Sequence, residues 1–83
     1  MAGTHYNYRL VITTNDGETI KLAGETAHDV KSMAGFLFHK NSIKRVYVGD
    51  IKGNHLLYLV KDENGHFVSE KFENIPSEYA LFG

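Results

Sequence analysis

The fold is decided within residues 8–22, YRLVITTNDGETIKL, where apolar and polar side chains alternate on either side of one glycine. A period of two is typical of a half-buried β-strand. A three-residue loop that ends at Gly17 places Ile12 opposite Ile20 and keeps the apolar side chains on one face. A two-residue Asp-Gly turn would place Ile12 opposite Lys21 and mix the faces. We therefore predict an antiparallel hairpin closed by the three-residue loop.

The segment after this hairpin has the period of an α-helix. Thr26 is a suitable N-cap, and Asp29 three residues later adds a capping-box-like carboxylate in the first turn. The residues that share one face at helical spacing are Val30, Met33, Ala34 and Leu37. We predict a helix over residues 27–40 that ends near Asn41.

Three further strands are predicted, separated by glycine-containing turns, at residues 43–50, 55–62 and 66–74. A two-residue turn at residues 53–54 would place Tyr47 opposite Val60. The Asn-Gly pair at residues 64–65 favours a second two-residue turn. A three-residue loop there would move every side chain of the last strand to the opposite face, and this alternative stays open.

These elements predict an α+β fold in the order ββαβββ, with one mainly antiparallel five-stranded sheet and a single helix packed on one face. The strand orders 2-1-3-4-5 and 2-1-5-4-3 both satisfy the predicted hairpins. The core beneath the helix is expected to contain Leu10, Ile12, Ile20, Leu22, Val30, Met33, Leu37, Val48, Leu57, Leu59 and Phe72.

The opposite face of the last three strands is also apolar, although antiparallel sheets commonly leave one face polar. Its expected members are Tyr47, Ile51, Leu56, Tyr58, Val60 and Phe67. A surface this rich in aromatic side chains suits a protein interface. We predict that another chain, either a second copy or a different protein, covers it. The competing cover is the apolar end of the chain after Pro76.

The composition fits one small domain over residues 1–83, with residues 1–5 and 76–83 as flexible or docking tails. The formal net charge is −1 and there is no cysteine. Residues 1–45 carry a basic excess and residues 46–83 an acidic excess. No apolar run has the length of a membrane span, and the N-terminal residues lack the pattern of a signal peptide. We therefore expect a cytoplasmic protein with no membrane partner.

No residue pattern predicts catalysis, a cofactor or a metal site. The five histidines lack metal-ligand spacing, and no serine lies in a nucleophile-elbow pattern. The glycines form neither a P-loop nor a dinucleotide fingerprint. We expect no enzyme activity, no cofactor and no small-molecule substrate. The first hypothesis is a non-catalytic protein-interaction module of the adaptor or inhibitor type, homodimeric in one version through the aromatic sheet face.

A small nucleic-acid-binding protein is the alternative hypothesis. A basic cluster is expected around the end of the helix and the start of the next strand, at His39, Lys40, Lys44 and Arg45. Tyr47 and Tyr58 would lie beside it. Single-strand binding platforms combine basic groups with stacking aromatic rings in this way. Basic residues at a helix C-terminus also complement the helix dipole, so this hypothesis ranks second.

Overall fold

The computed structural model describes residues 7–38 and 42–80 and contains the predicted elements in the predicted order. Along the chain these are β1 (Tyr8–Thr14), β2 (Thr19–Gly24), α1 (Ala27–Phe38), β3 (Ile43–Asp50), β4 (His55–Lys61), β5 (Phe67–Ser69) and two 3₁₀ helices, η1 (Phe72–Asn74) and η2 (Ser77–Ala80). The strands form one sheet in the order β2-β1-β3-β4-β5, with all neighbours antiparallel. The α+β fold and the ββαβββ order are confirmed, and the sheet has the first of the two open strand orders.

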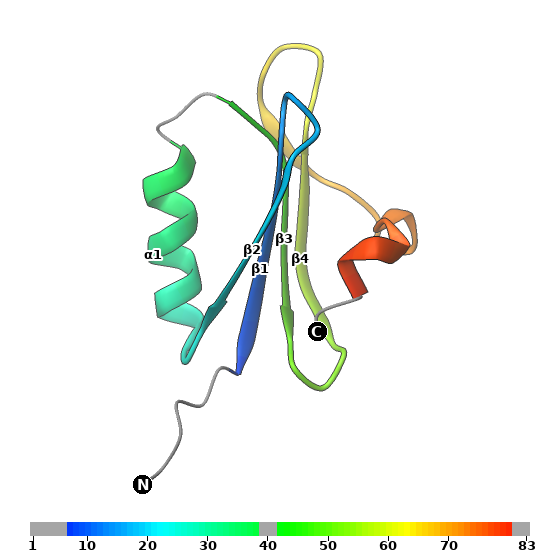
Figure 1. Ribbon diagram of the computed structural model, residues 1–83. Helices are drawn as coiled ribbons and strands as arrows, with labels where there is room; N and C mark the ends of the chain where they lie inside the picture. Colours follow the sequence, from blue (N-terminus) through cyan, green and yellow to red (C-terminus); the bar gives the residue numbers. More distant parts are fainter. Residues whose placement is uncertain (1–6, 39–41, 81–83) are drawn as a thin grey trace, which may run out of the picture.

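The sheet is the middle of three layers (Figure 1). α1 lies on one side, where it packs mainly against β1, β2 and β3. The segment after β5, which contains η1 and η2, lies on the other side. Both faces of the sheet are therefore covered in part, and each carries its own cluster of buried apolar side chains.

The three hairpin loops, residues 14–18, 50–54 and 62–66, share one geometry. The fourth residue of each loop is a glycine in the left-handed region, with φ of 89° at Gly17, 94° at Gly53 and 83° at Gly65. A side-chain oxygen of the first residue accepts the backbone N–H of the fifth: Thr14 from Glu18 (3.1 Å), Asp50 from Asn54 (2.8 Å) and Asp62 from His66 (2.9 Å). All three are three-residue hairpin loops with glycine at the position that needs a positive φ.

These loops set the register of the hairpins, and in the β3–β4 hairpin an irregularity between Val48 and Gly49 shifts it by one further residue. In the first hairpin Ile12 lies opposite Ile20, which confirms the prediction. The predicted register of β3 and β4 is wrong by two residues, since Tyr47 lies opposite Tyr58. Two features produce this difference: the loop has three residues with Gly53 in the left-handed region, and β4 has one extra residue at the irregularity between Val48 and Gly49. A shift of two residues leaves each side chain on its predicted face.

The last hairpin takes the alternative that the sequence left open. Lys61 lies opposite Phe67, so the loop has three residues and the faces of β5 are reversed relative to the two-residue turn. Phe67 therefore packs against the helix-side core, and its assignment to the opposite face is wrong. β5 is also shorter than the predicted strand over residues 66–74. Directly after it the Glu70 N–H donates to the Tyr58 carbonyl (2.9 Å), and beyond this hydrogen bond the chain turns away from the sheet.

The helix begins with the predicted capping box. The Thr26 N–H donates to the Asp29 carboxylate at 3.0 Å, and the Asp29 N–H donates to the Thr26 hydroxyl at 3.2 Å. Each group satisfies a backbone donor that the first turn of a helix leaves free. α1 extends to Phe38, and residues 39–41 lie outside the described residues.

The helix-side core confirms most of the predicted set. Its buried members are Leu10, Ile12, Val30, Ile43, Val46 and Val48, and packed against them are Tyr8, Ile20, Leu22, Met33, Leu59 and Phe67. Two predicted members are wrong. Leu57 is 38% exposed, since β4 lies beside the strands that α1 mainly covers, and Phe72 is 44% exposed in η1, on the other side of the sheet. The side chain of Leu37 lies outside what the structure describes.

Candidate interaction surfaces

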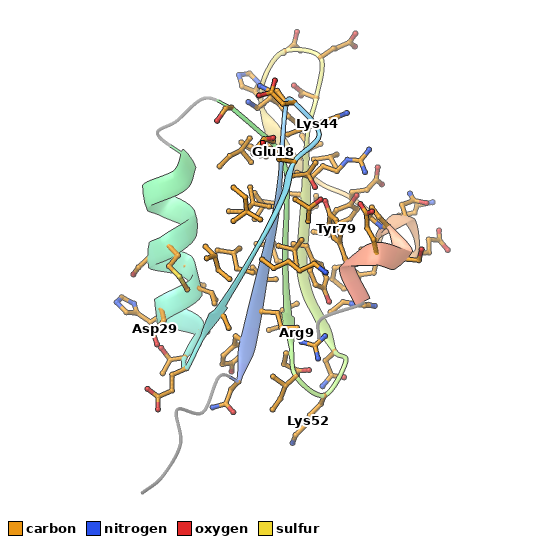
Figure 2. All side chains as sticks on the ribbon, in the orientation of Figure 1. Arg9, Glu18, Asp29, Lys44, Lys52 and Tyr79 are labelled. Atoms are coloured by element: carbon orange, nitrogen blue, oxygen red, sulfur yellow. The ribbon has the colours of Figure 1, made fainter. Side chains whose placement is uncertain are left out.

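The second face of the sheet is covered by the chain's own end. We call residues 70–80 the tail segment; its Tyr79 projects toward the sheet (Figure 2). Tyr79 is only 1% exposed and forms a cluster with Val11, Tyr47 and Tyr58. Val60 and Ile75 pack against this cluster. The sequence offered the apolar end of the chain after Pro76 as the competing cover, and this segment is the one that covers Tyr47 and Tyr58.

Ring contacts and hydrogen bonds fix the position of Tyr79. Its ring centroid lies 5.9 Å from that of Tyr47 and 6.4 Å from that of Tyr58, the latter edge to face. Its hydroxyl is hydrogen-bonded to the Thr13 hydroxyl. One residue earlier, the Glu78 carbonyl accepts a hydrogen bond from the Lys21 ammonium at 3.4 Å. The ring of Tyr79 therefore packs against Tyr47 and Tyr58, and its hydroxyl binds the Thr13 hydroxyl.

The rest of the tail segment is held loosely at the surface. η1 has no buried residue. The Lys71–Glu73 ion pair has an N–O distance of 3.9 Å, and both side chains are about three-quarters exposed. Such exposed pairs contribute little to stability. Tyr79 is therefore the main anchor of the tail segment.

The six residues predicted to form one interface do not share one surface. Tyr47 and Tyr58 are 5% and 3% exposed beneath the tail segment, and Val60 is partly buried beside them. Phe67 belongs to the helix-side core. Ile51 and Leu56 stay exposed, at 52% and 47%. The prediction of a single aromatic patch open to another chain is therefore corrected.

Among the described residues, four of the five exposed large apolar side chains lie on or next to the first half of β4, and the fifth, Val68, is on β5. We call the group of four the β4 ridge, and its members are Ile51, Leu56, Leu57 and Phe72. β5 pairs with Leu59–Lys61, so within the described part of the chain no strand pairs with the outer side of His55–Leu57. An open strand segment with apolar side chains around it is a known docking edge.

His55 connects the β4 ridge to the aromatic cluster, a role that the sequence did not predict. Its Nδ1 lies 2.7 Å from the Tyr47 hydroxyl, and its ring centroid lies 5.6 Å from that of Phe72. The register shift between Val48 and Gly49 brings this ring over the tyrosine face. A side chain at Gly49 would collide with the Tyr47 hydroxyl. Burial raises the pKa of Tyr47, so its hydroxyl stays protonated.

The predicted basic cluster is described only in part, since His39 and Lys40 lie outside the described residues. The other two members are Lys44 and Arg45. They line a hollow of about 250 Å³ together with Lys61, Glu70 and Asn74. Burial raises the pKa of Tyr58 at the base of this hollow, and the nearby Arg45 guanidinium offsets part of the rise. Because the rings of Tyr47 and Tyr58 are covered, neither is free to stack on a nucleic-acid base.

A larger hollow, of about 460 Å³, lies between the start of α1 and the β3–β4 loop. Its lining is polar, yet the Glu25 carbonyl accepts from the Asn7 side chain, the Thr26 N–H donates to Asp29 in the capping box, and the Asp50 carboxylate accepts from the Lys52 N–H. Among residues 7–38 and 42–80, no three His, Asp or Glu side chains gather closely enough to hold a metal ion. No helix in the described part of the chain has the length and apolar character that crossing a membrane needs.

Comparison of the chain with models of known protein families, with curated proteins and with solved structures finds no match.

Proposed function

We propose that this chain is a small non-catalytic protein-interaction module of the adaptor or inhibitor type, and that the β4 ridge is its binding surface. One observation carries the proposal: four large apolar side chains, 38–52% exposed, lie around the part of β4 that β5 leaves unpaired. Scattered single apolar residues are ordinary on protein surfaces, whereas a group along an open strand edge favours docking of another chain.

The geometry supports addition of a strand from the partner. His55–Leu57 offers an outer strand edge, and the side chains of Leu56 and Leu57 beside it are 47% and 38% exposed. A partner strand placed beside them would gain backbone hydrogen bonds at the edge and apolar contact with these two side chains. Either a second copy of the chain or a different protein can supply such a strand.

The proposal is tested by a double substitution, Leu56→Lys with Leu57→Lys. Both side chains are partly exposed, so the domain should stay folded while a charged edge resists strand pairing. Tagged parent and variant are compared by capture from a native lysate and by light scattering. We expect a bound protein, or a second copy, that the parent retains and the variant loses. An identical capture profile and oligomeric state for the two proteins would refute the β4 ridge as the surface.

The nucleic-acid hypothesis receives no comparable support. It needs open aromatic rings beside the basic residues, and the rings it would use are buried under Tyr79. Salt-sensitive binding of an oligonucleotide that Arg45→Glu removes would reverse this ranking.

A further inference from the structure

We infer that the sheet face beneath the tail segment is a binding site for a tyrosine-bearing segment of a partner protein, and that the tail segment is its intramolecular occupant. Phe72 belongs to both the tail segment and the β4 ridge, whereas Leu56 and Leu57 lie outside the tail segment, so substitutions at these two leucines test the ridge separately. The occupant seen in the structure defines the chemistry of the ligand.

The site is a surface of aromatic and aliphatic side chains on the sheet, and the side chain of Tyr79 covers it. Val11, Tyr47 and Tyr58 are all at most 5% exposed, and Tyr79 closes them off from water. Tyr79 is also the only residue of the tail segment, among those whose side chains are described, that is fully buried. One buried aromatic anchor with solvated surroundings is how short segments bind to protein surfaces.

Two polar contacts make the site selective for tyrosine in a particular backbone setting. The Thr13 hydroxyl pairs with the Tyr79 hydroxyl, which a phenylalanine ring lacks. Lys21 binds the carbonyl of the residue before the tyrosine, a group that every sequence offers. The contact with Thr13 selects for a tyrosine side chain, and the contact with Lys21 fixes the direction of the bound segment.

Charge on the same face favours an acidic segment. Arg9 lies opposite Gly49, and Arg45 lies opposite Val60; alternation along β1 and β3 places both on the tyrosine side of the sheet. The tail segment itself carries Glu78 next to its anchor. A partner segment with a carboxylate beside its tyrosine would share this complementarity.

The tail segment is displaceable because most of it is ordered without being buried. Its residues between Glu70 and Glu78 are exposed or half-exposed, and its only ion pair among the described residues lies in solvent. Ordering these residues costs conformational entropy that one anchor must offset. The tail segment is tethered, so its effective concentration is on the order of millimolar, and a partner segment must add contacts beyond the same anchor to displace it.

The test uses the full chain and a labelled peptide with the sequence of residues 70–80. In the Tyr79→Ala variant the anchor is removed while the sheet face remains. We expect saturable one-to-one binding of the peptide in fluorescence polarisation, at least about tenfold tighter than to the parent, whose site is filled. The same peptide with alanine in place of its tyrosine should not bind. Ser77→Ala, which keeps the anchor, should behave like the parent.

Three outcomes would overturn the inference: no saturable binding to a folded Tyr79→Ala variant, equal binding to variant and parent, or equal binding of the alanine peptide. A parent dimer in light scattering that Tyr79→Ala abolishes would assign the site to a second copy instead. When Leu56→Lys and Leu57→Lys are added to the variant, binding should still require the tyrosine of the peptide, which separates this site from the β4 ridge.

A measurement on the parent covers the case in which Tyr79→Ala does not fold. The Tyr79 N–H donates to the Pro76 carbonyl at 3.0 Å. If the tail segment undocks while the domain stays folded, this amide exchanges with solvent at least about tenfold faster than the amide of buried Val11. Equal protection of the two amides would show that the tail segment opens only with global unfolding, and would overturn the inference.

Discussion

The hydroxyl of Tyr79 is hydrogen-bonded to the hydroxyl of Thr13, a contact that spans 66 residues of sequence. It joins the end of the described chain to β1, the strand that lies between β2 and β3. The second face of the sheet is thereby closed by a segment with almost no other buried side chain. Both the stability of this face and its availability to a partner depend on the same contact.

The Thr13–Tyr79 pair is expected to be energetically coupled. Thr13→Val and Tyr79→Phe each remove one hydroxyl and leave the other without its partner, so each should cost about 0.5–1.5 kcal/mol of unfolding free energy. The double variant should cost scarcely more than either single one, since no unpaired hydroxyl then remains. Urea unfolding of the four proteins measures this. Fully additive costs would mean that the two hydroxyls do not interact in solution.

Two leucines provide a matched test of the helix-side core. Leu10 is completely buried, whereas Leu56 is 47% exposed on the β4 ridge. Leu10→Ala should cost about 2–5 kcal/mol, because it leaves a cavity between the sheet and α1. Leu56→Ala should cost less than about 1 kcal/mol. The midpoints of urea unfolding check both values, and similar losses at the two positions would contradict the assigned faces.

The sequence predicted the fold well where local signals and burial agreed. Alternation and a single glycine fixed the register of the first hairpin, and Thr26 with Asp29 marked the start of α1. The predicted β3–β4 register was wrong because Gly53 suits either a two-residue or a three-residue turn, and because no periodicity predicts the extra residue that β4 has opposite Val48 and Gly49. Since the error was an even number of residues, the face assignments survived it.

The candidate surface was harder to predict, for a physical reason. Alternation places Tyr47 and Tyr58 on the face opposite the helix, yet an apolar face has the same pattern whether another chain or the chain's own tail covers it. Tyr79 was visible as an apolar residue near the end of the sequence, but its depth of burial depends on a path of the chain that no periodicity encodes. The β4 ridge likewise arises because β5 ends early, at Ser69.

The two aspartates that open hairpin loops predict an acid-sensitive stability. The hydrogen bond from the Asn54 side chain holds the pKa of Asp50 below its ordinary value of 3.8, and the backbone N–H of His66 does the same for Asp62. A carboxyl whose pKa is lower in the folded state stabilises it above pH 3.8 and loses this effect as the pH falls through the folded value. The melting temperature should therefore fall on acidification below that pH.

Replacing both aspartates by asparagine should make the melting temperature depend less on pH. Asparagine keeps an oxygen that can accept the loop N–H groups, but it has no proton to gain in this range. Melting curves of parent and Asp50→Asn, Asp62→Asn, recorded from about pH 7 to about pH 2.5, give the comparison. The pKa of Glu70 is also lowered, most of all by the hydrogen bond from the Lys71 N–H. Because Glu70 remains in both proteins, the variant should keep a smaller decrease of melting temperature with falling pH. Parallel curves would exclude the loop aspartates as the source.

The shared geometry of the three loops predicts one common cost of removing their glycines. A Cβ at Gly17, Gly53 or Gly65 would meet no atom within 4 Å, so alanine causes no collision. The whole penalty is then the left-handed backbone, about 1–2 kcal/mol for a residue with a Cβ. Each glycine-to-alanine variant should lose that amount in urea unfolding, and the three losses should agree closely.

Asparagine at the same positions is the matched control. It tolerates the left-handed region better than alanine, because its short polar side chain can bond to the local backbone. Gly53→Asn should therefore lose less stability than Gly53→Ala, although it adds the larger side chain. If the two losses were equal, or if alanine were neutral at one loop only, that loop would not hold its glycine at positive φ. The register of its hairpin, and with it the position of the β4 ridge or of Phe67, would then have to be reassigned.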